Sequence, residues 1–500
     1  MKCDEYMKNF FIYLTVLLSV NMASGQPCLP DGIVFTSQSQ IDNFAINYPN
    51  CSEIQGPVTI AGGNITNLFG LYTLNAIGSS LYIENNPLLT NLAGLDNLTT
   101  IGGTIYIHNN SLLTDLLALN SLTSIGYSLI IQENHALMDL FGLNNLTFIG
   151  GKLLIMDNYG LINLSGLEGI SSVSLDCEIW CNINLITLEG LEHLSSIGGH
   201  LDIQSNLSLT SLSGLDSLTS IDGYLRLVQN PLVLNLTALS NLTSVKWITI
   251  QSLNTLENLH GLENLTSMTG GIEIIHNSHI KALTGLDSLI SIGTNLYVDH
   301  NDSLTSPIGL NRLSFVGGSL GFIENSSLTN LLELNNLTTV GGDIWIKENP
   351  MLTSLTGLGN IIADSINNLF LYANPVLSDC AVKSICDYID DPAGLAVIYG
   401  NTPGCNSKEE VESACQEVSS DDQSDTRLFL LYPNPADNKI TIETPIKGQL
   451  SIINLHGQQV LTSQTTEPRT QLDISSLPVG VYFVRLTGER KVELGRFVKE

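Results

Sequence analysis

Charged residues are scarce in this chain of 500 residues: they make up 13% of it, against about 25% in an average soluble protein. Basic residues are the scarcest, with 19 Lys and Arg against 48 Asp and Glu, and the formal net charge is −29. This excess of negative charge repels phosphate backbones and anionic lipids, so nucleic acids and acidic membrane surfaces are poor partners. Uninterrupted apolar runs that approach the length of a membrane-spanning helix are also lacking, and the sequence therefore predicts no membrane span.

The N-terminal segment, from Met1 to Gly25, has the pattern of a secretory signal peptide. Lys2 and Lys8 flank a short charged region, and residues 10–20 form an apolar run that is shorter than the ~20 residues needed to span a bilayer. Ala23 and Gly25 supply small residues for cleavage before Gln26. We therefore expect an exported protein.

Export makes disulfides plausible for the cysteines outside the signal peptide. The candidates are two cysteines before the repeats described below and four after them: Cys28, Cys51, Cys380, Cys386, Cys405 and Cys415. The last four allow three pairings, of which we favour Cys380–Cys405 with Cys386–Cys415. Cys177 and Cys181 lie in a predicted strand, where an extended chain would separate them by about 13 Å, beyond the ~7 Å limit for a bridge. We expect these two to be free.

A 24-residue phrase, GLDNLTTIGGTIYIHNNSLLTDLL at residues 94–117, repeats along most of the chain. The copies follow one another every 24 residues, except between Ala238 and Gly261, where the interval is 23 residues. A degenerate copy begins at Ile46. The full copies begin at Gly70, Gly94, Ala118, Gly142, Gly166, Gly190, Gly214, Ala238, Gly261, Gly285, Gly309, Glu333 and Gly357. A unit this short cannot bury its own apolar side, so the repeat predicts a stack of turns in which each turn covers the next.

Within each copy, apolar residues alternate with a period of two, as at Leu201 and Ile203, which indicates a strand with one buried face. An Asn follows each strand in nearly every copy. We interpret these residues as a stacked column that satisfies backbone groups at a corner, rather than as an amide ligand site. The column comprises Asn86, Asn110, Asn134, Asn158, Asn182, Asn206, Asn230, Asn277, Asn301, Asn325 and Asn349, and it is interrupted by Gly62 and Leu253.

Glycine pairs such as Gly102-Gly103 recur at a second corner, where we expect them to supply positive φ angles. Helices are predicted only as caps, over residues 37–45, over residues 379–389, and after the capping box of Ser407 and Glu410.

The repeat phrase, its Asn slot and the opening CSEIQGPVTI at residues 51–60 resemble the receptor L domain family. The resemblance covers about residues 28–415 and implies a right-handed, leucine-rich-repeat-like β-solenoid of the kind found in ligand-binding ectodomains of receptors. The chain departs from those receptors because it has many more turns and lacks a furin-like module, a membrane span and a kinase.

Residues 428–500 differ in composition from the rest, with eight basic and seven acidic residues. Their short alternating runs separated by glycines predict a small β-sandwich. The segment resembles the C-terminal sorting domain of type IX secretion substrates. The matching residues include Pro433, Asn434, Pro435, Gly457, Gly480, Tyr482 and Lys499. The resemblance implies export through the outer membrane of a Gram-negative bacterium, and often removal of the domain by a surface sortase with attachment to a lipopolysaccharide. An Ig-like stalk is the alternative.

The predicted fold class is therefore mainly β, a β-solenoid of 24-residue repeats with a small C-terminal β-sandwich. We divide the chain into a signal peptide (1–25), an N-terminal cap with the first degenerate repeat (26–69), the repeat solenoid (70–380), a disulfide-stapled cap (381–415), a linker (416–427) and the sorting domain (428–500).

No catalytic motif was found, and we expect neither an enzyme nor a bound cofactor. Repeated hydroxyls fall in one slot and predict a polar column: Thr99, Thr123, Thr219, Thr243 and Thr338. His276 and His300 share another slot and, with His279 and Asp299 nearby, are a candidate metal site, but we favour the interpretation that they are a pair of exposed surface histidines. Glu178 and Asp202 lie one turn apart, which leaves a polysaccharide hydrolase or lyase as an alternative.

The outward strand positions vary from turn to turn while the inward ones stay aliphatic. Exposed aromatic and apolar side chains on a rigid sheet favour a contact with a partner, and residues 130–180 are the preferred zone. The candidate binding residues are Tyr82, Tyr106, His108, Gln132, Leu154, Met156, Trp180, Tyr297 and Trp345. The sequence thus predicts a surface-attached protein that binds an unidentified protein or glycan; a spacer without a partner is the other alternative.

Overall fold

The computed structural model describes residues 26–422, 430–433, 435–444, 447–454, 459–465, 469–487 and 492–499. The chain divides into two compact units, Met1–Glu412 and Ser413–Glu500. The predicted signal peptide lies outside the described residues and stays a prediction. Among the described residues, no helix is both long enough and apolar enough to cross a bilayer.

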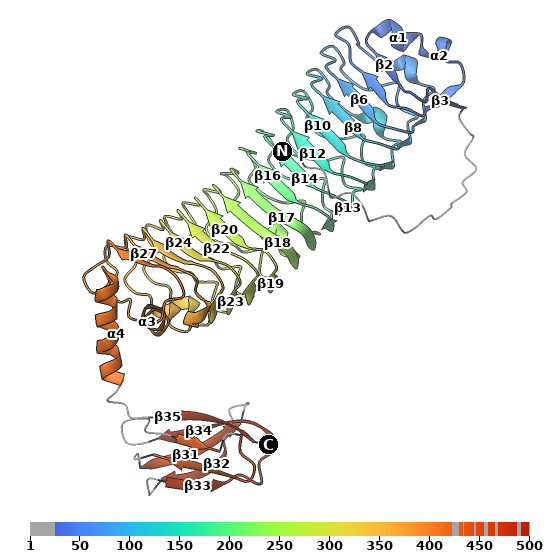
Figure 1. Cartoon of the computed structure of the whole chain (residues 1–500). Helices are drawn as coiled ribbons and strands as arrows, with labels where there is room; N and C mark the ends of the chain where they lie inside the picture. The colour runs from blue at the N-terminus through green and yellow to red at the C-terminus, as the bar shows by residue number, and fades with distance from the viewer. Residues whose placement is uncertain are drawn as a thin grey trace. The chain divides into compact units, whose positions relative to one another are not determined.

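The first unit is a β-solenoid in which every turn adds one main strand to a parallel sheet (Figure 1). These strands pair in register with their neighbours, so that equivalent residues of successive turns lie side by side. The main strands are β2 (Ile33–Phe35), β4 (Val58–Ile60), β6 (Leu81–Glu84), β8 (Ile105–His108), β10 (Leu129–Gln132), β12 (Leu153–Met156), β14 (Cys177–Trp180), β16 (Leu201–Gln204), β17 (Ser220–Val228), β18 (Ser244–Gln251), β20 (Ile272–Ile275), β22 (Leu296–Asp299), β24 (Leu320–Ile323), β26 (Ile344–Lys347), β27 (Leu369–Tyr372) and β28 (Ala396–Tyr399).

A second strand, which is shorter than the main strand from β5 onward, precedes the main strand in most turns. These strands are β1 (Gln26–Cys28), β3 (Cys51–Ile54), β5 (Ala76–Ile77), β7 (Thr100–Ile101), β9 (Ser124–Ile125), β11 (Phe148–Ile149), β13 (Ser172–Val173), β15 (Ser196–Ile197), β19 (Ser267–Met268), β21 (Ser291–Ile292), β23 (Phe315–Val316) and β25 (Thr339–Val340). In β17 and β18 the two strands of one turn merge. The merger in β18 follows from the single 23-residue interval, because the missing residue falls at the corner between the two strands.

The alternation of apolar residues produces the buried core as predicted. In β8, Ile105 and Ile107 are fully buried, while Tyr106 and His108 on the other face are half-buried. The sequence also missed turns at both ends of the stack. Strands β1 and β2 form a turn before the degenerate copy, and β28 pairs with β27 within the predicted cap. These turns escaped notice because their lengths differ from that of the repeat phrase.

The Asn column is confirmed as a buried ladder. The backbone N–H of Asn134 donates to Oδ1 of Asn158 (3.1 Å), and Nδ2 of Asn134 donates to the carbonyl of Ile107 in the preceding turn (2.9 Å). The same pattern continues through Asn374 and Asn401, which the sequence analysis missed. At the break in the column, the amide of Leu253 still donates to Oδ1 of Asn277 (2.9 Å), so the ladder resumes one turn later.

The residue before each ladder Asn adopts a left-handed conformation, with φ between 50° and 59° in the turns from Asn85 to Ala373. This conformation is unusual for residues other than glycine, yet glycine occupies the slot only at Gly400. Because the backbone conformation at this position is nearly the same in each turn, the side chains of successive turns leave the backbone in the same direction.

The expected role of the glycine pairs was wrong. Among the described glycines, positive φ occurs at the start of the repeat phrase, as at Gly94 (φ 114°), and not at Gly102 or Gly103. A Cβ on Gly102 would lie 2.3 Å from the carbonyl oxygen of Gly78, so the pairs are needed because successive turns approach closely.

Some turns have a 3₁₀ helix at the corner where other turns have a glycine with positive φ, such as Gly94. These helices are η1 (Phe69–Leu71), η2 (Leu117–Leu119), η3 (Thr237–Leu239), η4 (Leu332–Leu334) and η5 (Thr356–Leu358); η6 (Ala363–Ser365) lies at another corner.

Short helices cover the two ends of the stack, as predicted: α1 (Gln38–Asp42) and α2 (Phe44–Asn47) at one end, and α3 (Lys383–Asp390) at the other. The helix α4 (Lys408–Asp422) is capped by Ser407, whose Oγ accepts from the amide of Glu410 (3.2 Å). This helix continues to Asp422, so residues 416–422 of the predicted linker are helical.

Disulfides join Cys28 to Cys51 and Cys380 to Cys405, with Cα–Cα distances of 5.7 and 5.9 Å. Cys386 and Cys415 are also disulfide-bonded, and their mutual pairing stays a prediction. Cys177 and Cys181 are free, as expected.

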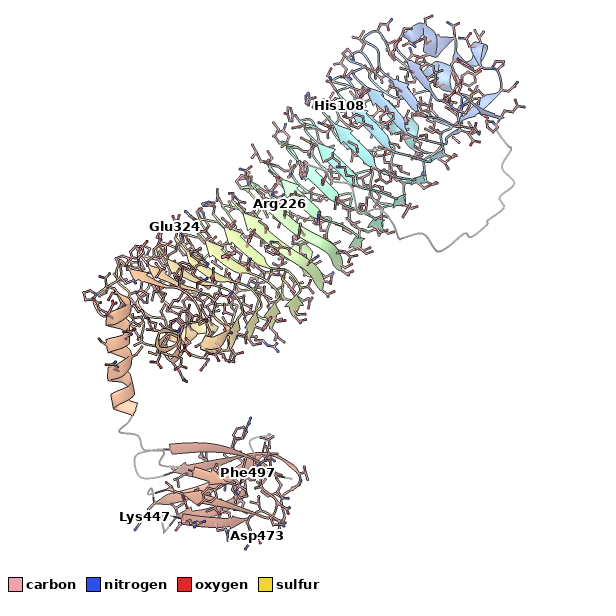
Figure 2. The ribbon with its side chains drawn as sticks, in the orientation of Figure 1. His108, Arg226, Glu324, Lys447, Asp473 and Phe497 are labelled. Carbon is pink, nitrogen blue, oxygen red and sulfur yellow. A yellow bond between two sulfur atoms is a disulfide. The ribbon has the colours of Figure 1, made fainter. Side chains whose placement is uncertain are left out.

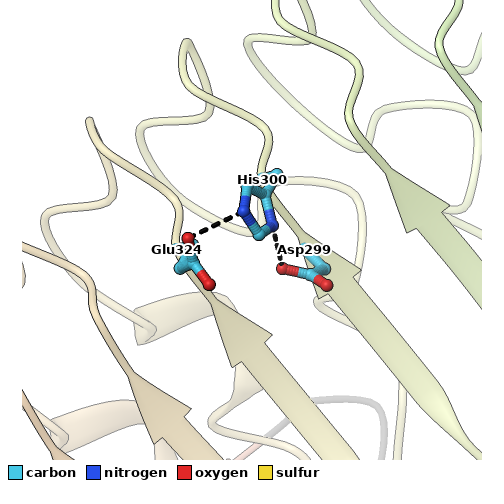
Figure 3. Close-up of side chains that lie close together, drawn as sticks. All are labelled: Asp299, His300 and Glu324. Carbon is cyan, nitrogen blue, oxygen red and sulfur yellow. Dashed lines mark hydrogen bonds and ion pairs between the residues drawn. The ribbon is translucent and has the colours of Figure 1, made fainter.

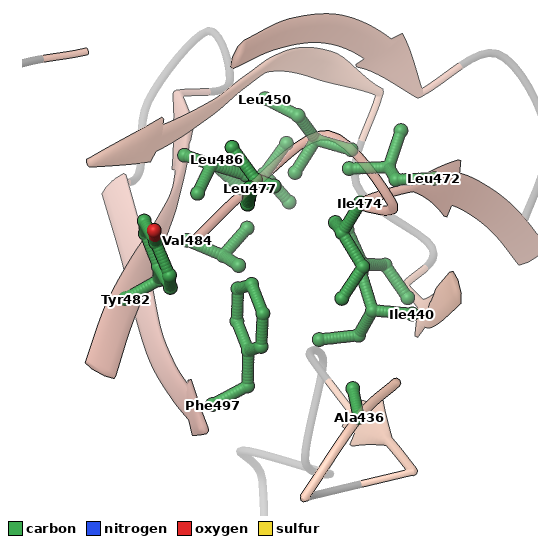
Figure 4. Packing of buried hydrophobic residues seen from close by; sticks show 12 residues of the cluster. Ala436, Ile440, Leu450, Leu472, Ile474, Leu477, Tyr482, Val484, Leu486 and Phe497 are labelled. Carbon is green, nitrogen blue, oxygen red and sulfur yellow. The ribbon is translucent and has the colours of Figure 1, made fainter. Parts of the chain in front are cut away.

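The second unit contains two antiparallel sheets around one apolar core (Figure 4). The sheets comprise β29 (Leu430–Tyr432), β30 (Lys439–Glu443) and β33 (Arg469–Asp473), and β31 (Gly448–Asn454), β32 (Gln459–Thr465), β34 (Gly480–Thr487) and β35 (Val492–Lys499). Phe497, Ile440 and Leu450 meet between the sheets and are fully buried.

Candidate binding face

We define the outer face as the residues in register with Tyr106 and His108 of β8 on the other main strands, such as Arg226 and Val228 of β17, together with the left-handed residue that follows each strand. Figure 2 shows His108, Arg226 and Glu324, from turns far apart in the sequence, along the same long side of the solenoid. Most of the predicted binding residues lie on this face and are half-buried. Leu154 is the exception: it is only 8% exposed, because the side chains of the adjacent turns cover it.

Aromatic rings gather in the first third of the outer face. The rings of Tyr82 and Tyr106 meet edge to face with centroids 6.2 Å apart, and Tyr106 stacks on His108 at 5.2 Å. Burial, Glu84 and Glu133 raise the pKa of Tyr106. The hydroxyl therefore stays protonated at neutral pH and remains available as a hydrogen-bond donor.

The middle third carries a continuous apolar stretch. Ile130 pairs with Leu154 across adjacent strands, and Met156 pairs with Trp180. Ile130, Met156 and Trp180 are half-buried, so each keeps part of its apolar surface in solvent. The stretch coincides with the preferred contact zone at residues 130–180.

The two carboxylates of the enzyme hypothesis are adjacent, but each has a basic partner. Glu178 pairs with Lys152 (2.9 Å) and Asp202 with Arg226 (2.9 Å). Burial raises the pKa of Asp202, while Arg226 opposes the shift. The arrangement is that of two ion pairs laid across neighbouring turns.

The last third of the outer face carries a second aromatic group. Trp345 stacks on Phe370 with centroids 3.7 Å apart, and Lys347 lies 5.8 Å from the ring centre of Tyr372. Gly321 precedes this group, and the ring of Tyr297 lies against it: a Cβ on Gly321 would come within 2.5 Å of that ring. Phe370 and Tyr372 were missed because their turn departs from the 24-residue spacing.

One imidazole on the outer face lies between two carboxylates (Figure 3). Nδ1 of His300 is 2.6 Å from Oδ1 of Asp299, and Nε2 is 2.7 Å from Oε2 of Glu324 in the next turn. The ring of His276 lies against that of His300, with centroids 4.3 Å apart. His279 is not part of this group and contacts Ser278 instead. Glu324 was missed, although it occupies the same repeat slot as the two histidines.

The remaining nucleophile candidates have structural roles. Burial raises the pKa of Cys177 to about 12, and burial together with Asp157 raises the pKa of Cys181, so both thiols are protonated at neutral pH. Hydroxyls of the predicted Thr column donate to carbonyls one turn back, as Thr219 does to Ser195 (3.0 Å). They form another ladder between turns.

Residues of the sorting motif lie in the second unit. Tyr482 is buried against Phe497 and donates its hydroxyl to the carbonyl of Pro478 (2.8 Å). Lys499 is 6% exposed, and its Nζ lies 3.7 Å from Asp437. Gly480 begins β34, and Pro433 and Pro435 lie between β29 and β30. Asn434 and Gly457 are outside the described residues.

Family comparisons agree with this two-part organisation. Residues 430–500 match the secretion system C-terminal sorting domain family. Residues 50–138 match the receptor L domain family. The chain carries both domains. No curated protein gave a match.

The sorting domain determines the destination of the protein. The protein is exported by the type IX system to the outer surface of a Gram-negative bacterium, and the sorting domain interacts with the secretion machinery. The receptor L domain match covers only the first turns of the solenoid, but the later turns repeat the same phrase.

Proposed function

We propose that this protein is a cell-surface binding protein, not an enzyme, and that the outer face of its solenoid holds a protein partner. The observation that carries the proposal is the contrast between the two faces of the main strands. Inward positions such as Ile105 and Ile107 are aliphatic in almost every turn, whereas the positions between them change. Core packing constrains the first set, and a partner would constrain the second.

The apolar stretch in the middle of the outer face favours a protein over a glycan. Half-exposed Ile130, Met156 and Trp180 offer side chains of the kind found at the centres of protein interfaces. Glycans bind chiefly to the open faces of aromatic rings, and in the last third of the face the rings of Trp345 and Phe370 already cover each other.

The charge of the outer face narrows the choice of partner further. Acidic residues outnumber Arg226 and Lys347: they are Glu84, Glu133, Asp157, Glu178, Asp202, Glu273, Asp299, Glu324 and Glu348. Complementarity therefore favours a partner that presents basic residues around an apolar patch. Basic residues at its rim would speed association, and apolar residues at its centre would set the lifetime of the complex.

The proposal is tested by a binding screen followed by matched variants. The secreted chain is applied to arrays of extracellular proteins and of glycans, and each hit is measured again with Trp180→Ala and Tyr106→Ala. We expect protein hits whose affinity falls at least about tenfold, as for interface hot spots. Phe141→Ala is the control, because Phe141 is 44% exposed but lies away from the main strands.

Four outcomes would contradict the proposal. Affinity that is unchanged in both outer-face variants would place the contact elsewhere, and glycan hits alone would change the partner class. A chain with no hits that still coats the cell would be a spacer. Turnover of a polysaccharide that is lost in Glu178→Gln would indicate an enzyme.

The sorting domain supports a further step at the cell surface. We propose that a sortase removes it and joins the solenoid to a surface lipopolysaccharide. Mass spectrometry of surface-released protein should then find the solenoid without residues 430–500; intact chain on the surface would contradict this step.

A further inference from the structure

The group around His300 has the composition of a transition-metal site. Its members are a histidine and two carboxylates, Asp299, His300 and Glu324, whose ligand atoms all lie within 4.8 Å of one another. They come from two adjacent turns, β22 with its following residue and the residue after β24. Imidazole with carboxylate oxygen is a ligand set typical of Zn²⁺ and related divalent metals.

Each ring nitrogen of His300 faces a carboxylate, so the role of each nitrogen depends on the tautomer. In the neutral tautomer with its proton on Nδ1, donated to Asp299, Nε2 carries a lone pair that a metal can bind. That nitrogen faces the carboxylate of Glu324 at 2.7 Å. Two acceptors at this distance require a cation between them, which is either a proton or a metal ion.

A metal fits this position after a small movement. Metal–ligand distances near 2.0–2.1 Å require a nitrogen-to-oxygen separation of roughly 3 Å. Glu324 is a long side chain at the surface, and its carboxylate need shift by only a fraction of an ångström to reach that separation. Asp299 would hold the ring in orientation, as carboxylates behind metal-binding histidines commonly do.

The left-handed slot repeats residue types that can bind metals in successive turns. Four successive turns place His276, His300, Glu324 and Glu348 in this slot, with φ between 50° and 59°. Because the backbone conformation is the same in each, their side chains leave the sheet in parallel, one turn apart. The ring of His276 packs against that of His300, with centroids 4.3 Å apart, but His276 is not among the residues whose ligand atoms lie within 4.8 Å of one another.

We propose that His300 and Glu324, with Asp299 orienting the ring of His300, bind a divalent transition metal on the outer face. The metal would be held by Nε2 of His300, a carboxylate oxygen of Glu324 and water, which leaves positions open to a ligand from outside. The site does not depend on the proposed protein partner and can be tested without it.

The test is calorimetric titration of the tag-free full chain with Zn²⁺ after removal of bound metal by a chelator. We expect one site with micromolar affinity that weakens at least tenfold in His300→Ala and in Glu324→Gln. Asp299→Asn should also weaken it, by roughly 10–100-fold, because this residue orients the ring of His300 without bonding the metal. His279→Ala is the control, since His279 lies close in sequence but outside the group.

Two further measurements separate a built site from general attraction to an acidic protein. Co²⁺ in place of Zn²⁺ should give visible absorption bands that change in His300→Ala. Ca²⁺, which prefers oxygen ligands, should bind weakly, and with equal affinity, to the unmodified chain and to His300→Ala. Zn²⁺ affinity that is the same in His300→Ala, Glu324→Gln and the unmodified chain would overturn the proposal.

Discussion

The Asn ladder makes a quantitative prediction at Asn158, which is fully buried in the middle of the column. Its Oδ1 accepts from the amide of Asn134 (3.1 Å), and its Nδ2 donates to the carbonyls of Ile131 (2.9 Å) and Met156 (3.0 Å). Asn158→Ala would leave at least one donor and one acceptor buried without a partner. At about 1–3 kcal/mol for each such group, the free energy of unfolding should fall by roughly 2–6 kcal/mol.

Asn97→Ala is the matched control, because Asn97 also donates to a carbonyl of the preceding turn, that of Tyr72 (2.9 Å), but is exposed. Water can replace that hydrogen bond, so the control should lose at most about 1 kcal/mol. Asn158→Leu copies the natural break at Leu253 and fills the space, but it restores neither hydrogen bond. We expect its stability to lie between those of the alanine variant and the unmodified chain.

Urea denaturation followed by circular dichroism measures the loss, and hydrogen exchange locates it. Because each turn contacts only its neighbours, the increase in exchange should centre on the turns that contain Asn134 and Asn158. Losses that are equal in Asn158→Ala and Asn97→Ala would refute the reasoning, since burial is the difference between the two sites.

Two further predictions concern a corner and an ion pair. Gly94→Ala should lower the melting temperature markedly, because φ is 114° and the new Cβ would lie 2.0 Å from the carbonyl oxygen of Leu68. Gly63→Ala should be tolerated, because its new Cβ would meet no atom within 4 Å, and equal melting temperatures of the two variants would contradict this prediction. Because burial raises the pKa of Asp202 above its usual 3.8, stability falls as the pH rises from 3.8 through that raised pKa. Asp202→Asn removes this titration and should gain stability relative to the unmodified chain between pH 3 and pH 7 in urea denaturation; a gap that narrows with rising pH would be inconsistent with it.

The fold was largely predictable because its determinants recur at fixed spacing. Leu201 and Ile203 repeat a pattern that only stacked turns can bury, and the Asn slot marks the corner of each turn. The pattern failed where the spacing changed, which concealed the strands β1, β2 and β28 and the last two ladder residues. The glycine pairs were misjudged because a sequence does not distinguish a need for positive φ from a need for close approach between chains.

The candidate site was less predictable because it depends on side-chain contacts between turns. The alternation identified Tyr106 and Trp180 as outward, but not that neighbouring turns would bury half of each ring. His276 and His300 were paired from their shared slot. Glu324 was missed although it occupies the same slot one turn later, where its carboxylate reaches His300.

The nearest-neighbour contacts of the stack bear on how such a protein changes over generations. Duplication or loss of one whole 24-residue segment would lengthen or shorten the rod by about one strand spacing, roughly 4.8 Å, without altering the packing at either tip. Insertions or deletions of any other size must be absorbed at a corner, as the loss of one residue is in the 23-residue turn. Gene variants should therefore differ mostly by complete repeats. Each such change would alter the distance between two groups of outward side chains by a whole number of strand spacings.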